Sequence, residues 1–220
     1  MTKFFFALIL ATFTLGAQTT KDPGDFKSLK VFDKIQAEII PSDANRVEIS
    51  GNRSSDVEVV NNNGQLKIRM ALKKMFDGDD ILVKVYFRQL NAIDASEGSY
   101  VGCAEPIKQD FISLNAKEGA QIKLQLAVDK AEIRSVTGGM LKLSGTADVV
   151  DARLGTGGIL EAEKLETRQT DIDIKAGGDA SVFATQYVNA TVKGGGHVDV
   201  YGNPNQVNQK TALGGSVKVH

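Results

Sequence analysis

A repeat of glycine and apolar positions runs through the second half of the chain. A glycine recurs every 18 to 21 residues, and mostly apolar residues lie three and five positions after it. Gly138-Gly-Met-Leu-Lys-Leu143 and Gly195-Gly-His-Val-Asp-Val200 are two copies of this pattern. Mostly apolar residues also lie five and three positions before each glycine, so the period of two predicts a half-buried strand on either side of it. The seven glycines are Gly98, Gly119, Gly138, Gly157, Gly177, Gly195 and Gly214.

Equivalent positions that recur at this interval predict an all-β fold, a right-handed parallel β-helix with about 19–20 residues per rung. Each rung would pair with the next at strand spacing, about 4.8 Å, and the inward side chains would form columns. Glycine at each corner supplies a backbone conformation that a side chain disfavours. The right hand follows from the crossover preference of parallel strands. An antiparallel sandwich is the alternative, but it does not require equivalent positions to align.

The first half of the chain is strand-rich but less regular. Residues 18–91 are interpreted as an N-terminal cap with the first rungs, and residues 92–220 as regular rungs, all in one continuous domain. Asn61-Asn-Asn-Gly64 predicts a turn between two strands. The segment Lys73–Asp80 is interpreted as a polar loop. The cap would cover the open end that a repeat stack otherwise exposes.

The first seventeen residues have the order of a secretory signal peptide. Lys3 precedes an apolar run that ends at Leu15, and the small residues Gly16 and Ala17 follow. We expect residues 1–17 to be this signal peptide, with cleavage after Ala17. A buried N-terminal helix is the alternative. The mature protein is then expected to be exported, whether periplasmic, at the cell surface or secreted.

Composition narrows the function classes. Lysine and arginine number 26 against 27 acidic residues, a formal net charge of −1, whereas non-specific nucleic-acid binding needs a basic surface. Cys103 is the one cysteine, so an intramolecular disulfide and a multi-thiolate metal site are excluded. The two histidines, His197 and His220, leave little for histidine-based catalysis. We expect no cofactor and no catalytic residues.

One outward column of the predicted β-helix carries stacked carboxylates. Glu132, Asp151 and Asp171 each lie six positions before a corner glycine. Such a column could hold a cation through oxygen ligands or place an acid–base pair for sugar cleavage. Arg134 and Arg153 occupy the adjacent column, however, which favours a solvated ladder of ion pairs. The three acids are therefore weak candidates for a metal site.

Two further segments have a simple interpretation. Asp77-Gly-Asp-Asp80 lacks the remaining ligand spacing of an EF-hand and is interpreted as a polar turn. His197 lies outward beside the inward Val198, with no serine or cysteine partner evident in the sequence, and is interpreted as a surface histidine.

The strand motifs resemble a known family, the putative auto-transporter adhesin, head GIN domain. The motifs that carry the resemblance span nearly the whole mature chain. What the resemblance implies is a right-handed β-helix exposed outside the cytoplasm, with a role in adhesion and no catalytic residues to transfer. These motifs are Phe32-Asp-Lys-Ile, Val47-Glu-Ile-Ser-Gly51, Gly64-Gln-Leu-Lys-Ile68, the segment from Val83 to Gly98, and the glycine-cornered repeats that follow.

Three functions follow as hypotheses. The first is a non-catalytic exported solenoid that binds an external macromolecule, either a polysaccharide or an extracellular protein. The second is a carbohydrate-active lyase or hydrolase that uses the carboxylate column. The third is a structural protein of the cell envelope that self-associates through the solenoid ends, because the strand Ser216–Val219 would leave an open edge.

Overall fold

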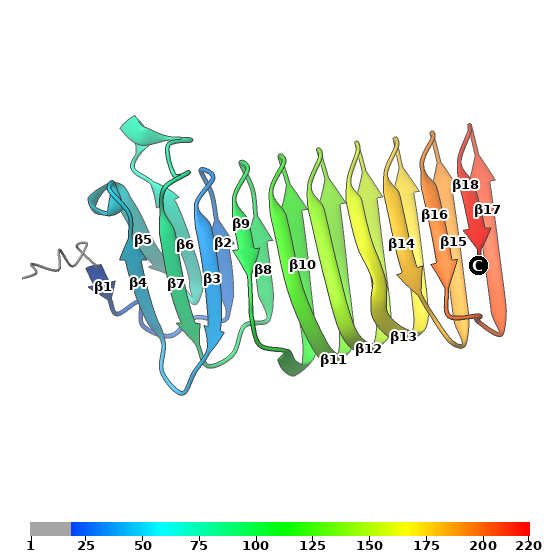
Figure 1. The fold of residues 1–220 in the computed structure, drawn as a ribbon, viewed down its shortest axis with the longest axis horizontal. Coiled ribbons are helices and arrows are strands. Elements are labelled where there is room, and N and C mark those ends of the chain that lie inside the picture. Colours follow the sequence, from blue (N-terminus) through cyan, green and yellow to red (C-terminus); the bar gives the residue numbers. More distant parts are fainter. Residues whose placement is uncertain (1–18) are drawn as a thin grey trace, which may run out of the picture.

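The computed structural model describes residues 19–220, so the expected signal peptide at 1–17 lies outside the described residues. Nearly all of the described chain is wound into a β-solenoid of about 7 turns. Figure 1 shows the turns stacked side by side along the long axis, from β1 at one end to β18 at the other. The predicted all-β solenoid is confirmed.

Each turn contributes to two sheets that face one another across the core. Sheet I has the order β1-β4-β7-β3-β9-β11-β12-β13-β14-β16-β18. Sheet II has the order β5-β6-β2-β8-β10-β11-β12-β13-β15-β17. The strands are β1 Thr19–Lys21, β2 Ser28–Val31, β3 Gln36–Pro41, β4 Arg46–Ser50, β5 Val57–Asn62, β6 Gln65–Met70, β7 Leu82–Phe87, β8 Ala92–Ala95, β9 Tyr100–Gly102, β10 Ile107–Lys117, β11 Gln121–Val136, β12 Met140–Gly155, β13 Ile159–Lys175, β14 Asp179–Phe183, β15 Tyr187–Lys193, β16 His197–Tyr201, β17 Gln206–Ala212 and β18 Ser216–Val219.

The predicted inward columns form the core. Leu141 pairs with Ile122 of the preceding turn and with Leu160 of the next, and all three side chains are buried. Parallel pairing of this kind places like residues above one another, so each column is a stack of aliphatic side chains. Burial of such stacks is the main stabilising contribution to a fold of this type.

The corner glycines serve a tight two-residue turn. Thr137 and Gly138 have φ of 53° and 72°, which is the left-handed pair of a type I′ turn. Gly139 is required for a different reason, because a Cβ built there would overlap the carbonyl oxygen of Ala116 in the preceding turn. The doubled glycines therefore combine a turn conformation with a close approach of two backbones. All seven predicted corners have positive φ: Gly98, Gly119, Gly138, Gly157, Gly177, Gly195 and Gly214.

A second corner, opposite the glycine turns, lies within the long strands. The pairing register of β11 with β12 omits Asp129 and Asp148, and Val128 and Ala131 are both buried on either side of this bend. The alternation of inward and outward side chains therefore shifts by one residue at this bend. The glycine repeat gives no sign of this corner, because no glycine or proline marks it.

The N-terminal turns are stacked in an order that differs from the chain order. The turn formed by β2 and β3 pairs with β6 and β7 on one side and with β8 and β9 on the other. The strands β1, β4 and β5 pair antiparallel and cover the end of the stack. In this order β3 rather than β7 is the strand next to β9.

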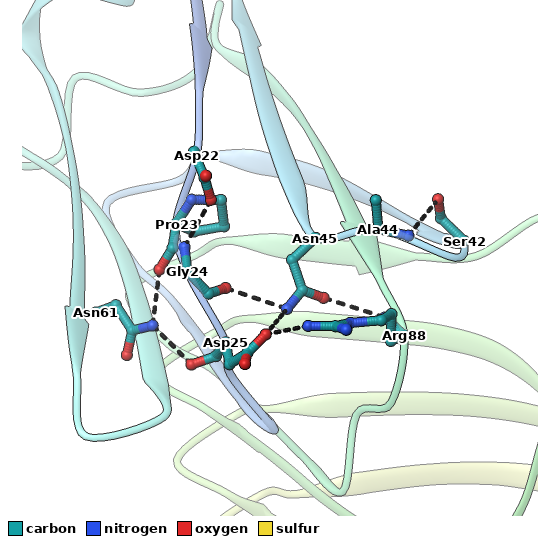
Figure 2. Close-up of polar contacts among 9 residues, drawn as sticks. All are labelled: Asp22, Pro23, Gly24, Asp25, Ser42, Ala44, Asn45, Asn61 and Arg88. Carbon is teal, nitrogen blue, oxygen red and sulfur yellow. Dashed lines mark hydrogen bonds and ion pairs between the residues drawn. The ribbon is translucent and has the colours of Figure 1, made fainter.

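A polar network fastens the segment before β2 to this cap. Figure 2 shows Asn61 Nδ2 donating to the carbonyl oxygens of Pro23 and Asp25, at 2.7 and 2.8 Å. Asn45 Nδ2 donates to Gly24 O at 3.1 Å, and the Arg88 guanidinium pairs with the Asp25 carboxylate. The loops that follow β3 and β7 and the end of β5 are joined to this segment in this way.

Candidate functional site

The outward surface of sheet II, here called the polar face, carries the residues that the sequence singled out. Strand register stacks Ser113, Glu132, Asp151, Asp171 and Asn189 in one column across β10, β11, β12, β13 and β15. The column two positions further along each strand contains Asn115, Arg134, Arg153, Asp173 and Thr191. The sequence prediction that the three acids stack is confirmed by this register.

Each acid of the column has a polar partner. Glu132 Oε1 accepts from Lys130 Nζ at 2.7 Å, and Asp151 Oδ2 accepts from Arg153 Nη2 at 3.1 Å. Asn189 Nδ2 donates to Asp171 Oδ1 at 2.5 Å. The first two pairs lie within one strand rather than between turns.

The surface therefore contains ion pairs, as the alternating charges predicted. Arg153 neutralises an acid of the column as expected, but Glu132 pairs with Lys130 rather than with Arg134. The hydrogen bond that the Lys130 ammonium donates to Glu132 raises the pKa of Lys130 above its ordinary value. Lys130, Glu132 and Arg153 keep a third or more of their side chains exposed, so such pairs contribute little to stability.

The polar face is hollowed in two places. One hollow of about 370 Å³ extends from β6 and β2 across β8 and β10 to Asp151 and Arg153. A second, also about 370 Å³, continues from these two residues to Asn189 and Thr191. The two hollows adjoin at Asp151 and Arg153, and together they make a polar track across most turns of the solenoid.

Residues in the first hollow retain hydrogen-bonding capacity. Asp94 Oδ1 and Asn115 Oδ1 are buried without a hydrogen-bond partner, and the two residues are neighbours in the register. Asp94 reaches a cation only through its second oxygen, which lies 3.7 Å from Lys30 Nζ. Buried oxygens without partners are uncommon in folded proteins, so this part of the polar face differs from an ordinary solvated ladder.

The carboxylate column is not arranged as a metal centre. Within residues 19–220, no three histidine, cysteine, aspartate or glutamate side chains are grouped so that they could hold a metal ion.

The described part of the chain also contains no helix long and apolar enough to cross a membrane.

The structure brings together a polar cluster that the sequence prediction missed. His197 Nδ1 lies 2.7 Å from Ser216 Oγ, and its Nε2 lies 3.1 Å from Asp199 Oδ2. The 19-residue interval does contain this signal, because His197 and Ser216 both follow a corner glycine by two positions. The expectation that His197 has no serine partner is therefore wrong.

The backbone amides of Ser216 and His197 are already hydrogen-bonded within the ladder between turns. An oxyanion site needs free backbone N–H groups beside the nucleophile. The amide of Ser216 donates to Gly196 O, and that of His197 donates to Gly178 O. Both donors are part of the ladder between turns, and the cluster acts as a polar link between the last two turns.

A comparison with protein-family models finds a match over most of the chain. A family model described as putative auto-transporter adhesin, head GIN domain, matches residues 25–204. No curated protein matches the chain.

Several solved structures share the fold. A putative adhesin from Bacteroides fragilis is 18% identical, with a TM-score of 0.87, and the match covers 94% of this chain and 98% of that one. A putative adhesin from Parabacteroides merdae is 20% identical, with a TM-score of 0.73 over 93% of this chain and 95% of that one. A third, from Parabacteroides distasonis, is 21% identical, with a TM-score of 0.70 over 94% and 98%.

Proposed function

The chain belongs to the putative auto-transporter adhesin, head GIN domain family, and from this premise we propose that it is an exported, non-catalytic recognition protein. Its polar face binds an extended external polymer, a polysaccharide or an extracellular protein. The observation that carries this proposal is the polar track, in which two hollows adjoin at Asp151 and Arg153. Successive turns repeat similar groups at strand spacing, so a polymer lying along the solenoid axis meets one set of contacts per turn.

The chemistry of the track supports binding rather than turnover. Acid–base cleavage of a sugar needs one carboxyl that donates a proton and one that stays ionised. Glu132 and Asp151 are instead paired with cationic neighbours of their own strands. Such pairs can exchange one partner for hydroxyl or amide groups of a ligand.

The first experiment is binding of the mature chain, from Gln18 onward, to a panel of polysaccharides and extracellular-matrix proteins. The assay is run with and without Ca²⁺, and the soluble fraction is analysed for cleavage products. We expect retention on a ligand without products. Release of oligosaccharides would refute the non-catalytic proposal, and retention that requires Ca²⁺ would assign a cation to the carboxylate column.

A variant pair locates the binding surface. Glu132→Gln/Asp151→Asn/Asp171→Asn alters the polar face, and we expect it to weaken binding at least about tenfold, the effect of losing one or two charged hydrogen bonds. Lys142→Gln/Glu161→Gln is the matched control, because this pair, at 2.6 Å, lies on sheet I. Equal loss in both variants would contradict the assignment to the polar face.

A further inference from the structure

The connection between β6 and β7 exposes an unusual concentration of apolar side chains. Leu72, Met75 and Phe76 are exposed by 71%, 43% and 49%, and Leu82 follows with 39%. Half of the large exposed apolar side chains in the described part of the chain thus lie on this segment and the residue that follows it. The sequence interpretation of Lys73–Asp80 as a polar loop is therefore only partly correct.

This segment, residues 71–81, is held in place by buried contacts. The carboxylate of Asp33, only 2% exposed, accepts from the amides of Met70 and Phe76 at 2.9 and 3.0 Å. The Gly78 amide donates to Asp33 O at 3.1 Å. Phe76 has φ of 64°, a left-handed conformation that a bulky residue disfavours. The fold thus fixes a strained backbone and directs apolar side chains into solvent.

The acidic side chains of the loop are ion-paired, whereas, within residues 19–220, its two lysines are not. Its acids are occupied, since Arg53 pairs with Asp77 and Asp80 at 3.1 Å, and Lys34 pairs with Asp79 at 3.3 Å. Lys73 and Lys74 are exposed and make no ion pair with any residue of the described chain. The uncompensated charge beside the apolar side chains is therefore positive.

The position of the loop suits contact with a broad surface. Figure 1 shows it, in turquoise, projecting beyond the glycine turns at the N-terminal end of the solenoid. Leu72 and Met75 flank the two lysines in sequence. Apolar side chains that enter the acyl region, with lysines that reach the phosphates, are the usual arrangement at a membrane interface.

We propose that loop 71–81 docks the protein on the surface of a membrane that contains anionic lipids. Leu72, Met75 and Phe76 enter the boundary between headgroups and acyl chains, and Lys73 and Lys74 contact lipid phosphates. A protruding apolar tip fits a deformable bilayer, whereas a protein partner would need a preformed pocket of matching shape. This site is separate from the polar face, so a docked protein keeps its recognition surface free.

The chain contains no tryptophan, so the fluorescence of one introduced tryptophan reports on its own site alone. Phe76→Trp places a single indole in loop 71–81, and Phe111→Trp places one at a different exposed site, where the phenylalanine is 37% exposed. The probes are vesicles of phosphatidylcholine with phosphatidylglycerol, and vesicles of phosphatidylcholine alone. We expect a blue shift of Phe76→Trp emission with the anionic vesicles, and an unchanged Phe111→Trp spectrum. No shift at millimolar lipid, or equal shifts at both sites, would overturn the proposal.

Vesicle flotation then tests the individual contributions. We expect Leu72→Ser/Phe76→Ser to reduce binding at least about tenfold, and Lys73→Gln/Lys74→Gln to reduce it about tenfold at low salt only. Leu213→Ser is the control, because Leu213 is 85% exposed at the opposite end of the solenoid. Full binding by the Leu72/Phe76 variant, or equal loss in the Leu213 control, would refute loop docking. Circular dichroism confirms that each variant is folded, and the polymer assay reports on the polar face independently.

Discussion

At the scale of single residues, adjacent glycines in one turn have different physical roles. Gly138 needs its left-handed φ of 72°, and open space surrounds the position of its missing Cβ. Gly139 needs room, because a methyl group there would meet the backbone of the preceding turn. The sequence predicted the first role from the repeat interval. The second depends on the distance between turns, which the interval does not contain.

Alanine substitutions separate these two roles. We expect Gly138→Ala to lower the free energy of unfolding by about 1 kcal/mol, the cost of a left-handed residue with a Cβ. Gly139→Ala should cost about 3 kcal/mol, because one turn must move away from its neighbour. Urea unfolding followed by circular dichroism measures both values. A larger loss for Gly138→Ala than for Gly139→Ala would contradict this assignment.

A second prediction concerns the carboxylate that links the last two turns. The hydrogen bond from His220, at 2.6 Å, and that from His197 hold the pKa of Asp199 below its ordinary value. A lowered folded-state pKa stabilises the folded chain above the unfolded pKa, near 4. This stabilisation is lost as the pH falls from there through the lowered value.

We therefore expect the last turn to loosen below about pH 4, and Asp199→Asn to be loosened already at pH 6. The Tyr201 ring stacks on His220 with centroids 4.5 Å apart, so its NMR resonances report this change. The effect on global stability should be about 0.5 kcal/mol, as for other exposed pairs. Tyr201 resonances that remain the same in Asp199→Asn at pH 6 would contradict the role of the carboxylate.

At the scale of elements, the sequence predicts strands and glycine turns well and other connections poorly. The hairpin of β5 and β6 was predicted from Asn61–Gly64, and its two-residue turn has the left-handed residues Asn63 and Gly64. Loop 71–81 was not predicted in detail, because its conformation depends on Asp33, more than thirty-five residues earlier. A tertiary hydrogen bond of this kind has no local signature.

The Asp33 carboxylate gives the third prediction. Asp33→Ala leaves the amides of Met70 and Phe76 without an acceptor, so we expect a loss of about 2 kcal/mol or more. Asp33→Asn keeps one acceptor oxygen and should lie between this variant and the wild type. Amide hydrogen exchange at Met70 and Phe76, with urea unfolding, measures the effect. Asp79→Ala, which removes an exposed acid of the same loop, is the control and should change stability by less than about 0.5 kcal/mol.

At the scale of the whole molecule, the candidate site is less predictable than the fold. The repeat interval was sufficient to stack Glu132, Asp151 and Asp171, because register follows from periodicity. It did not predict which cation pairs with each acid, since Lys130 and Arg134 lie on either side of Glu132 and side-chain reach decides between them. Each hollow is lined by side chains from several turns together, which the sequence of one repeat does not show.

The two ends of the solenoid differ in whether further strands cover the terminal turn. Antiparallel strands cover the N-terminal end, whereas β17 and β18 leave the last turn unpaired on its outer side in the described chain. Two inward positions of β17 are polar, Gln209 and Thr211, where β15 has the buried Ala190 and Val192. Polar residues at a terminal repeat allow water to solvate it, and Lys210 and Lys218 discourage edge pairing.

We expect the protein to be a monomer in sedimentation velocity at high concentration. Gln209→Val/Thr211→Val makes the terminal surface apolar and should produce dimers or larger species. Lys193→Gln, at the exposed end of β15 one turn further in, is a control that should remain monomeric. A stable wild-type dimer would instead support self-association through the solenoid end.

The out-of-order stacking of the first turn constrains the way in which the chain can acquire its structure during synthesis. Ser28–Val31 must wait for Ala92–Ala95 before both of its edges are paired, whereas each later turn adds directly to the one before it. Early folding therefore depends on contacts of high sequence separation, which form slowly, and later folding resembles templated growth. Removal of the last turn should spare the rest, but a deletion within residues 28–102 would remove the template itself.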